Sequence, residues 1–313
     1  MSDRQPHPHA HSGPHSHSDG HGHDTTHPDW GDLAPVLERE AELATPLYEQ
    51  VTDWLRTLLG GAEERAAGEA SVRRVWDVGS GPGVVTCLLA QAFPHAEVVA
   101  VDPTPALLAR ARDRAARLGL GDRVVTHEAE LPTGITELGT ADLIWTSKVL
   151  HHVGDQRAAV ALLAGRLRPG GVLAVAEGGL PDRVLPRDIG IGRPGLQARL
   201  DAAQEEWFAR MRAALPGYRE TVEDWPALLA DAGLADTGSR SFLLDLPAPL
   251  DGAARDHVAA RLSRAAEQYG DLLDDADRAT LARLADPEDE AAIAHRPDAF
   301  LLTARTVHAG RAE

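Results

Sequence analysis

Short apolar runs alternate with amphipathic segments through the middle of the chain. The amphipathic segments carry apolar residues three and four positions apart, and they begin near Val84, Pro105 and Asp155. Apolar runs separated by such segments predict parallel strands joined by helices, with both faces of the sheet covered. Right-handed crossovers would bring the carboxyl ends of these strands to one edge. The predicted strands are residues 74–78, 97–102, 123–127, 141–146 and 172–177.

The pattern differs on both sides of this region. Residues 33–43 and 45–59 predict two helices, and Tyr48 lies off the apolar stripe of the second, which favours a surface position. After Glu177, residues 180–195 are typical of a loop, and a long helix is expected from Leu196 to Leu215. Thr221 to Asp224 resembles a capping box. Strands are expected at 239–246 and 300–307, with two helices within 251–285.

Together these elements predict an α/β fold. We expect a doubly wound, mostly parallel seven-stranded sheet of Rossmann-like type, with a helical N-terminal lead-in and helical insertions after strands five and six. The expected division is residues 1–30 as a tail, 31–70 as N-terminal helices and 71–313 as the main domain. The helical lid insertions fall at about 180–235 and 251–295.

Three alternate glycines, Gly79, Gly81 and Gly83, follow the first strand and precede a helix. Glycine lets the backbone turn sharply and lets a ligand approach main-chain atoms, and the helix N-terminus offers unpaired N–H groups. The next strand ends in Asp102, about 20 residues later, where a carboxylate can accept both hydroxyls of a ribose. The loop and the acid together indicate a site for a nucleoside cofactor.

These residues resemble the class I S-adenosylmethionine-dependent methyltransferases. The segment from Asp77 to Gly83 is similar to the first motif of that family, Val101-Asp102 to its ribose-binding acid, and Leu167 to Leu173 to its late loop and strand. A NAD-binding fold shares the glycine loop and the distal acid. The position of Asp77 and the Arg-Pro-Gly-Gly turn favour the methyltransferases, and the resemblance covers about residues 70–180.

The resemblance implies S-adenosyl-L-methionine as cofactor. Asp77 would reach its ammonium group, the loop would shape the methionine pocket, and Asp102 and Glu128 would hold ribose and adenine. Glu128 stands where the family usually has Asp, and a solvated strand end is the other interpretation of this glutamate. The residues expected at the cofactor are Asp77, Gly79, Ser80, Gly81, Gly83, Asp102, Pro103, Glu128, Ala129 and Thr146.

Candidates for removing a proton from the acceptor follow the fourth strand. His151 and His152 offer imidazoles, which accept protons near neutral pH. The other interpretation is a packed turn in which a ring hydrogen-bonds the backbone. Glu177, which ends strand five, could orient a group in the same crevice or cap a helix. Lys148 could pair with an acidic substrate or lie on the surface.

Composition narrows the function. The formal charge of −17, without a cluster of Lys and Arg, argues against nucleic acid as a partner. Cys87 is the single cysteine and is expected to be a small buried residue, so the chain cannot form an internal disulfide. With no signal-peptide pattern and no apolar run of spanning length, we expect a cytoplasmic protein that does not bind membranes. A homodimer is one option for its assembly.

Residues 1–30 are rich in Pro, Gly, Ser and His, and no core is expected there. Their histidines could bind Ni, Cu, Zn or Co ions loosely, or the tail could be solvated and without a role. No metal is expected in the fold itself. The histidines in question are His7, His9, His11, His15, His17, His21, His23 and His27.

The sequence therefore predicts an enzyme that transfers a methyl group from S-adenosylmethionine to an O, N or C atom of a small-molecule metabolite. One alternative is a metal-responsive binding protein, in which the tail binds metal and the fold holds a cofactor without turnover. Another keeps the cofactor but changes the reaction. The acceptor atom is not predicted by the sequence.

Overall fold

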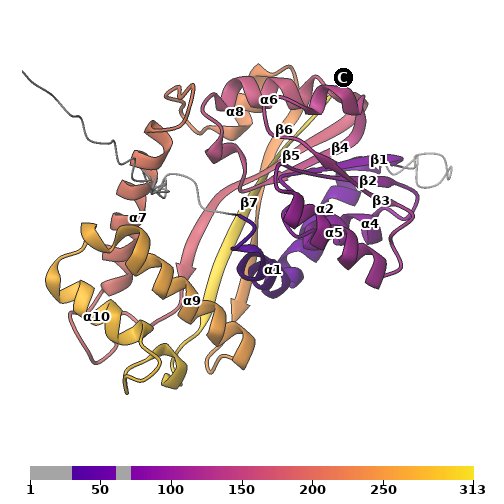
Figure 1. Cartoon of the computed structure of the whole chain (residues 1–313). Helices are drawn as coiled ribbons and strands as arrows, with labels where there is room; N and C mark the ends of the chain where they lie inside the picture. The colour runs from indigo at the N-terminus through magenta and orange to yellow at the C-terminus, as the bar shows by residue number, and fades with distance from the viewer. Residues whose placement is uncertain (1–29, 61–71) are drawn as a thin grey trace, which may run out of the picture.

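The computed structural model describes residues 30–60 and 72–313, and within them seven strands form one sheet (Figure 1). The strand order is β3-β2-β1-β4-β5-β7-β6. β7 is antiparallel to both of its neighbours, and β1 to β5 pair in parallel. This confirms the predicted sheet. The strands are β1 (Arg74–Val78), β2 (Glu97–Asp102), β3 (Val124–Glu128), β4 (Ala141–Ser147), β5 (Leu167–Arg183), β6 (Ala235–Leu246) and β7 (Leu301–Arg311).

Helices cover both faces of the sheet because successive side chains of each strand point to opposite sides. Val75 and Leu143 belong to one buried cluster, together with residues of α2 and α4, whereas Trp76 and Ile144 belong to a second, with residues of α6 and α8. The helices are α1 (Ala34–Leu43), α2 (Thr45–Leu59), α4 (Val84–Ala92), α5 (Pro105–Arg117), α6 (Gln156–Ala164), α7 (Leu196–Ala213), α8 (Trp225–Asp231), α9 (Gly252–Tyr269) and α10 (Asp275–Ala285).

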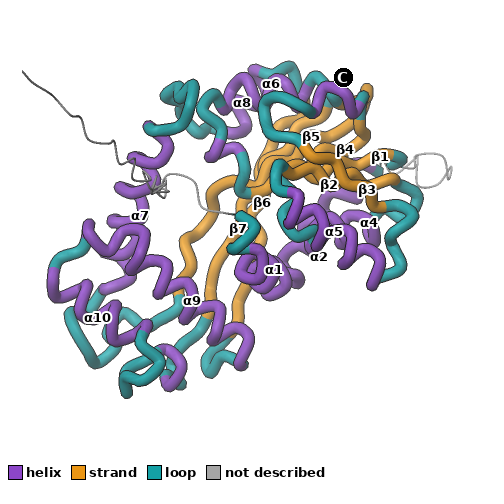
Figure 2. The backbone as a smooth tube through the Cα atoms, in the orientation of Figure 1, coloured by secondary structure: helices purple, strands orange, loops and turns teal. Residues whose placement is uncertain are grey.

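Strands β5, β6 and β7 extend beyond the compact part of the sheet toward α9 and α10 (Figure 2). The prediction of a loop from residue 180 was wrong at its start, because β5 continues to Arg183. The pairing of β5 with β7 shifts register between Ala176 and Gly179. A Cβ on Gly179 would lie 2.1 Å from the carbonyl oxygen of Ala304, so this bulge requires glycine. The glycines that form this bulge look like those of a loop when only the sequence is considered, which is why the strand was predicted to end too early.

Ion pairs join the loop after β5 and the start of α7 to α10. Asp277, which is 2% exposed, accepts hydrogen bonds from Arg193 at 2.7 Å and from Arg199 at 2.5 Å. Arg183 pairs with Asp201 at 2.7 Å. The sequence leaves open whether Arg183, Arg187 and Arg193 bind a carboxylate substrate or lie in a solvated loop. Arg183 and Arg193 pair with acids of the protein itself, and Arg187 is exposed.

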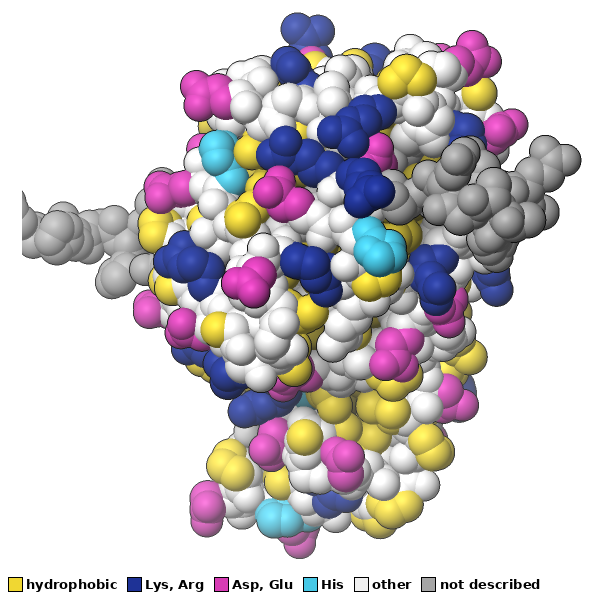
Figure 3. Space-filling view, turned by 90° about the vertical axis from the view of Figure 1, so that its right-hand side faces the viewer, with side chains coloured by type: hydrophobic (Ala, Val, Ile, Leu, Met, Phe, Trp, Pro, Cys, Tyr) yellow, Lys and Arg dark blue, Asp and Glu magenta, His cyan; other side chains and the backbone are white. Residues whose placement is uncertain are grey.

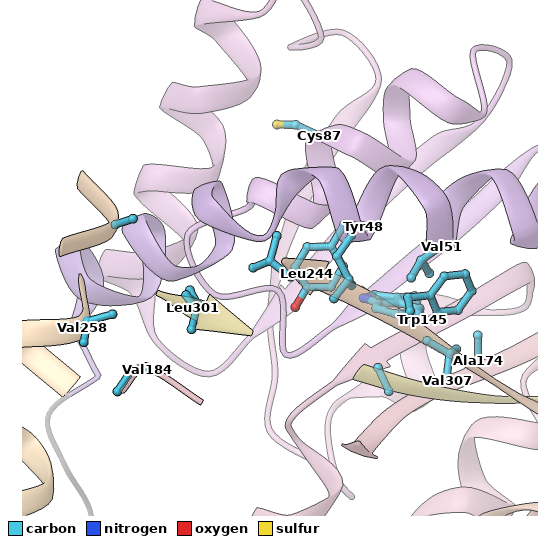
Figure 4. Packing of buried hydrophobic residues seen from close by; sticks show 14 of the residues in the cluster. Tyr48, Val51, Cys87, Trp145, Ala174, Val184, Leu244, Val258, Leu301 and Val307 are labelled. Carbon is cyan, nitrogen blue, oxygen red and sulfur yellow. The ribbon is translucent and has the colours of Figure 1, made fainter. Parts of the chain in front are cut away.

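Three local predictions were wrong. Tyr48 is buried rather than on the surface, with its ring edge-on to Trp145 at 6.4 Å between centroids (Figure 4), because α2 buries a wider face against the sheet than its strongest stripe. Leu118, which the three- and four-residue spacing predicts on the apolar face of the helix that begins at Pro105, is half exposed, since it lies just past the end of α5. The cap of α8 is Asp224, whose side chain accepts from the amide of Ala227, and Thr221 plays no part in it.

On the face that carries the β3 end of the sheet, Lys and Arg side chains are interspersed with Asp and Glu (Figure 3). No helix in the described part of the chain has both the length and the apolar character needed to cross a membrane.

Candidate active site

Parallel pairing gathers the predicted cofactor residues at one edge of the sheet. Val78 lies opposite both Val101 and Thr146 in the register, and Asp102 lies opposite Glu128. The glycine loop, Asp102, Glu128 and Thr146 therefore share the carboxyl edge of the strands, where doubly wound folds bind their ligands. Pro103 and Ala129 directly follow the two acids, and the amide of Ala129 donates to the carbonyl of Asp102 at 3.3 Å.

The glycine loop is packed at its two ends and open in the middle. All three glycines have positive φ, between 53° and 78°. A Cβ on Gly79 would lie 2.0 Å from Val149, and one on Gly83 would lie 2.5 Å from the Cβ of Ala111. A Cβ on Gly81 would meet nothing within 4 Å among the described residues. A ligand can therefore reach the main chain at Gly81, while both ends of the loop are held against the fold.

Asp102 is bound to that loop. Its carboxylate accepts hydrogen bonds from the amide of Gly81 at 3.0 Å and from the amide of Thr104 at 2.9 Å. The side chain is 6% exposed, and burial raises the pKa of Asp102 despite these two donors. Each carboxylate oxygen keeps a second lone pair, so the acid can still accept from a diol at the edge of the sheet.

Asp77 is a second buried carboxyl group, 2% exposed, beneath the loop. Thr86 of α4 donates a hydrogen bond to it at 2.5 Å. Burial raises the pKa of Asp77 to about 7, and the nearby charge of Asp102 raises it further than burial alone would. Within residues 30–60 and 72–313 no cation pairs with this carboxylate. An ammonium group brought by a ligand would stabilise its ionised form.

Two buried hydroxyl groups at the same edge point to a missing polar partner. The side-chain oxygens of Ser80 and Thr146 are inaccessible to solvent and have no hydrogen-bond partner among the described residues. Buried polar atoms in proteins are nearly always paired, so such atoms mark a place for a ligand or water. The open glycine, the two acids and these hydroxyls fit the amino-acid and ribose parts of S-adenosylmethionine.

His151 and Glu177 form a pair beside this edge. Glu177 is 6% exposed and lies 2.9 Å from Nδ1 of His151, while its other oxygen accepts from the amides of Val149 and Leu150, each at 2.9 Å. Burial alone would raise the pKa of Glu177, but the His151 imidazole and the two amides hold it below its usual range. Glu177 thus accepts from the backbone of the turn after β4 with one oxygen and contacts His151 with the other.

Aromatic rings surround the two histidines. The rings of His151 and His152 lie 4.2 Å apart, and Phe208 of α7 lies 5.5 Å from His151. Trp30 stands edge-on to His152 at 5.3 Å. Arg212 of α7 donates to the carbonyls of His151 and Val153, at 2.8 and 2.7 Å. The long helix α7 is therefore fastened to the candidate catalytic turn.

The sequence-based reasoning missed four residues of this region. These are Glu40, Phe208, Arg212 and Arg305, which approach the turn or Lys148 from α1, α7 and β7. No local motif marks them, because distant segments bring them together. Lys148, which pairs with Glu40, does stand out in the sequence, because it is the only lysine among the 31 Lys and Arg residues of the chain. Its φ of 58° is rare for a residue other than glycine.

No group of three or more His, Cys, Asp or Glu side chains in the described residues is arranged to hold a metal ion. The eight histidines for which loose metal binding was predicted lie outside the described residues.

Comparison with known proteins agrees with this geometry. A family model described as a methyltransferase domain matches residues 76–173. A trans-aconitate 2-methyltransferase of Methylobacterium radiotolerans is 39% identical over 110 residues, which cover 34% of this chain and 38% of that protein. An O-methyltransferase family protein of Burkholderia thailandensis shares 23% identity at a TM-score of 0.43, over 64% of this chain and 53% of that structure.

The chain spans about a quarter to two fifths of the length of the first curated relatives that it matches. The match is longer for a trans-aconitate 2-methyltransferase of Methylobacterium nodulans, which is 32% identical over 221 residues, or 64% of this chain and 80% of that protein. This relative is aligned over most of its length, and the methyltransferase family model matches the strands that build the site. The chain therefore belongs to the class I S-adenosylmethionine-dependent methyltransferases.

Proposed function

We propose that this protein transfers a methyl group from S-adenosylmethionine to an O, N or C atom of a small-molecule metabolite. The observation that carries the proposal is the oriented pair of His151 and Glu177, which lies beside the glycine loop at the carboxyl edge of the sheet. Relatives named for methyl transfer to trans-aconitate support a small acceptor.

The cofactor residues divide the work of binding. Asp77 and Ser80 would hold the amino-acid part, the backbone at Gly81 would lie against it, and Asp102 would accept from the ribose. Glu128 is exposed at the end of β3 and would face the adenine. When bound, S-adenosylmethionine supplies an electrophilic methyl group on a sulfonium. The protein's part is to align the acceptor with that group and to exclude water.

His151 would take the proton that the acceptor loses. With its Nδ1–H donated to Glu177, a neutral imidazole presents a lone pair on Nε2. The buried carboxylate fixes this tautomer and stabilises the imidazolium that forms, so the acceptor's electron pair becomes available for the new bond. Glu177 acts as a positioning residue in this scheme, and His151 acts as the base.

The surroundings of the site favour a small acceptor. Helix α7 is tied to the turn by Arg212, and α1 lies across from it through the pair of Glu40 with Lys148. We assign the two helical insertions and α1 to a lid over the acceptor. The charge of −17 speaks against nucleic acid, and the lone cysteine suits a reducing compartment such as the cytoplasm.

The test is a turnover assay with the full chain. S-adenosylhomocysteine release would be measured against a panel of hydroxylated and carboxylated metabolites, with mass analysis of the products. For an accepted compound, we expect His151→Asn and Glu177→Gln each to lower kcat by about 10²-fold or more. His295→Gln is the matched control, because His295 is exposed and its ring hydrogen-bonds the carbonyl of Pro287, away from the proposed site.

Two outcomes would contradict the proposal. Cofactor binding without product from any acceptor would favour the non-catalytic alternative, and a product without an added methyl group would indicate another reaction on the same cofactor. If both variants keep full turnover, His151 is not the base.

A further inference from the structure

Five charged side chains, one of them in the turn after β4, are joined by ion pairs, and we call them the charge cluster: Glu40, Lys148, Asp182, Arg261 and Arg305. Glu40 of α1 pairs with both Lys148 and Arg305, the latter at 3.5 Å. Asp182 of β5 pairs with Arg261 of α9 at 3.1 Å and lies 4.0 Å from Arg305. Four separate elements and the turn after β4 therefore contribute to one ionic cluster.

The cluster has more cations than anions. Its three cations face two carboxylates, and the histidine that borders it, His257, is 4% exposed with its pKa lowered by burial, which favours the neutral ring. Burial would also raise the pKa of Glu40, yet the charges of Lys148 and Arg305 hold it far below its usual range. This position strongly prefers an anionic oxygen.

The anion that occupies the position belongs to a weakly buried helix. Ala34 is the only buried residue of α1. The helix is held instead by ion pairs, with Glu38 on Arg110 at 3.1 Å and on Arg114 at 2.7 Å, and with Glu42 on Arg114. The pairs of Glu38 with Arg110 and of Glu42 with Arg114 each have a partner that is 44% or 52% exposed, and such pairs contribute little to stability and are screened by salt; the pair of Glu38 with Arg114 is more buried. Glu40 is thus carried by a helix that buries a single residue, whereas Arg305 belongs to β7 and Lys148 directly follows β4, so displacement of Glu40 requires only α1 to move.

The two cations are linked to the turn that carries the proposed base and to its partner Glu177. Lys148 precedes His151 by three residues, and its own amide donates to the carbonyl of Ala176, the neighbour of Glu177. Arg305 lies close enough to Glu177 and Tyr48 for both to raise its pKa. Lys148 has a left-handed backbone, and its side chain, the chain's only lysine, pairs with Glu40 of α1.

We propose that Lys148 and Arg305 bind a carboxylate group of the methyl acceptor, and that Glu40 occupies this place until the acceptor displaces it. The assignment rests on the proposed methyl transfer and names the acceptor class as carboxylic acids. Displacement frees α1 from the crevice, and the acceptor's carboxylate then neutralises the same two cations. A cationic acceptor does not fit, because it would meet a cluster whose charge is already positive.

Calorimetry on the full chain tests this assignment, with citrate as the charged probe and triethyl citrate as its uncharged counterpart. We expect wild type to bind citrate and not the ester. Glu40→Gln should tighten citrate binding by about tenfold, because the internal competitor is lost, and Lys148→Met should weaken it by about tenfold. Arg39→Gln removes an exposed cation of α1 that is not part of the charge cluster, and it should change binding by less than about twofold.

S-adenosylhomocysteine binding, measured in parallel, separates the two proposals. If wild type does not bind S-adenosylhomocysteine, the proposed function is contradicted. The citrate affinities of the variants would still test whether the cluster binds a carboxylate. Citrate affinities that are equal in wild type, Glu40→Gln and Lys148→Met would overturn the inference, as would equal binding of the ester.

A second measurement needs no variant. Reductive methylation with ¹³C-formaldehyde labels Lys148 and the terminal amine alone and keeps their charge. We expect the NMR signal of Lys148 to shift with citrate and to stay unchanged with triethyl citrate. A shift of the terminal signal only, or of neither, would contradict the assignment even if the variants fail to fold.

Discussion

Asp77 and Asp102 are buried carboxyl groups on adjacent strands, and their environments give them different roles. Asp102 holds two backbone donors and faces the edge of the sheet, whereas Asp77 has one hydroxyl donor and lies under the loop. Neither has a cation partner within the described residues. Both therefore gain from a ligand that brings hydroxyl groups or an ammonium group, which is what the proposed cofactor offers.

Replacing Asp102 tests the ribose contact. Asp102→Ala should weaken S-adenosylhomocysteine binding by about 1–3 kcal/mol, because charged hydrogen bonds are lost and the amide of Gly81 loses its acceptor. Titration calorimetry would measure this, with Asp122→Ala, an exposed aspartate before β3, as control. Unchanged affinity would remove Asp102 from its assigned role.

Replacing Asp77 tests the buried charge through pH. The pKa of Asp77 is about 7 in the fold against an ordinary 3.8, so its contribution to stability is complete below pH 3.8 and is lost as the pH rises through 7. The Asp77→Asn variant has no carboxyl group to ionise there, so its free energy of unfolding does not fall in this pH range for that reason. Without cofactor, the variant should match wild type near pH 4 and exceed its free energy of unfolding at pH 8 by on the order of 2 kcal/mol.

Urea denaturation at several pH values would measure this difference. Wild type should also gain more stability from S-adenosylhomocysteine at pH 8 than the variant does, because the ammonium group pairs with the ionised acid. Parallel stability curves for the two proteins would contradict the shifted pKa.

At the scale of elements, the loop between β1 and α4 combines rigidity with access. Gly79 and Gly83 are pressed against Val149 and Ala111, so the loop cannot shift toward the fold. Gly81 alone faces open space. Gly79 and Gly83 are needed for packing, and Gly81 is the one that a ligand can approach. All three nevertheless belong to one motif and have positive φ angles.

A matched pair of variants separates these roles. Gly83→Ala should destabilise the fold by roughly 2 kcal/mol or more, because the new methyl group overlaps Ala111 and the left-handed backbone is strained. Gly81→Ala should cost only about 1–2 kcal/mol of stability from its backbone angle, but it should reduce S-adenosylhomocysteine binding strongly. Thermal melting and calorimetry on both variants would check this. Equal losses of stability and of binding would show that the loop does not divide in this way.

For the whole molecule, the organisation is a doubly wound sheet with a helical body on its three long strands (Figure 1). The candidate site lies where the two meet, since His151 from the turn after β4 contacts Phe208 of α7, and Arg305 of β7 reaches Glu40 of α1. Trp30, the last residue of the His-rich segment and the first that the structure describes, contacts His152.

Truncation tests whether that segment takes part in catalysis. Removal of residues 1–29 should leave the rate of S-adenosylhomocysteine release within about twofold, because every residue assigned to the site is retained. In the truncated chain, Trp30→Ala should lower kcat/KM, since the edge contact on His152 is lost. Steady-state kinetics would measure both. A large loss on truncation alone would favour the metal-binding alternative, and binding of nickel or zinc to the tail would then be measured directly.

Most elements could be predicted because their signals are local. Apolar runs, glycine turns and caps such as Asp155, which accepts from the amide of Ala158, are written in neighbouring residues. The same holds for the glycine loop and Asp102, whose spacing follows from one strand, one helix and one further strand. The extension of β5 was missed because Gly178 and Gly179 belong to a bulge that only the pairing with β7 reveals.

The sequence by itself thus predicted a mostly parallel seven-stranded sheet, an edge for the cofactor and a turn after the fourth strand that carries His151, whereas the strand order comes from the structure. Only the tertiary structure decided that Glu177 orients that histidine, that Tyr48 is buried, and that Glu40 shares Lys148 with Arg305. Periodicity records which side of an element is apolar, whereas an ion pair between residues 40 and 305 depends on how helices and strands from the two ends of the chain pack together.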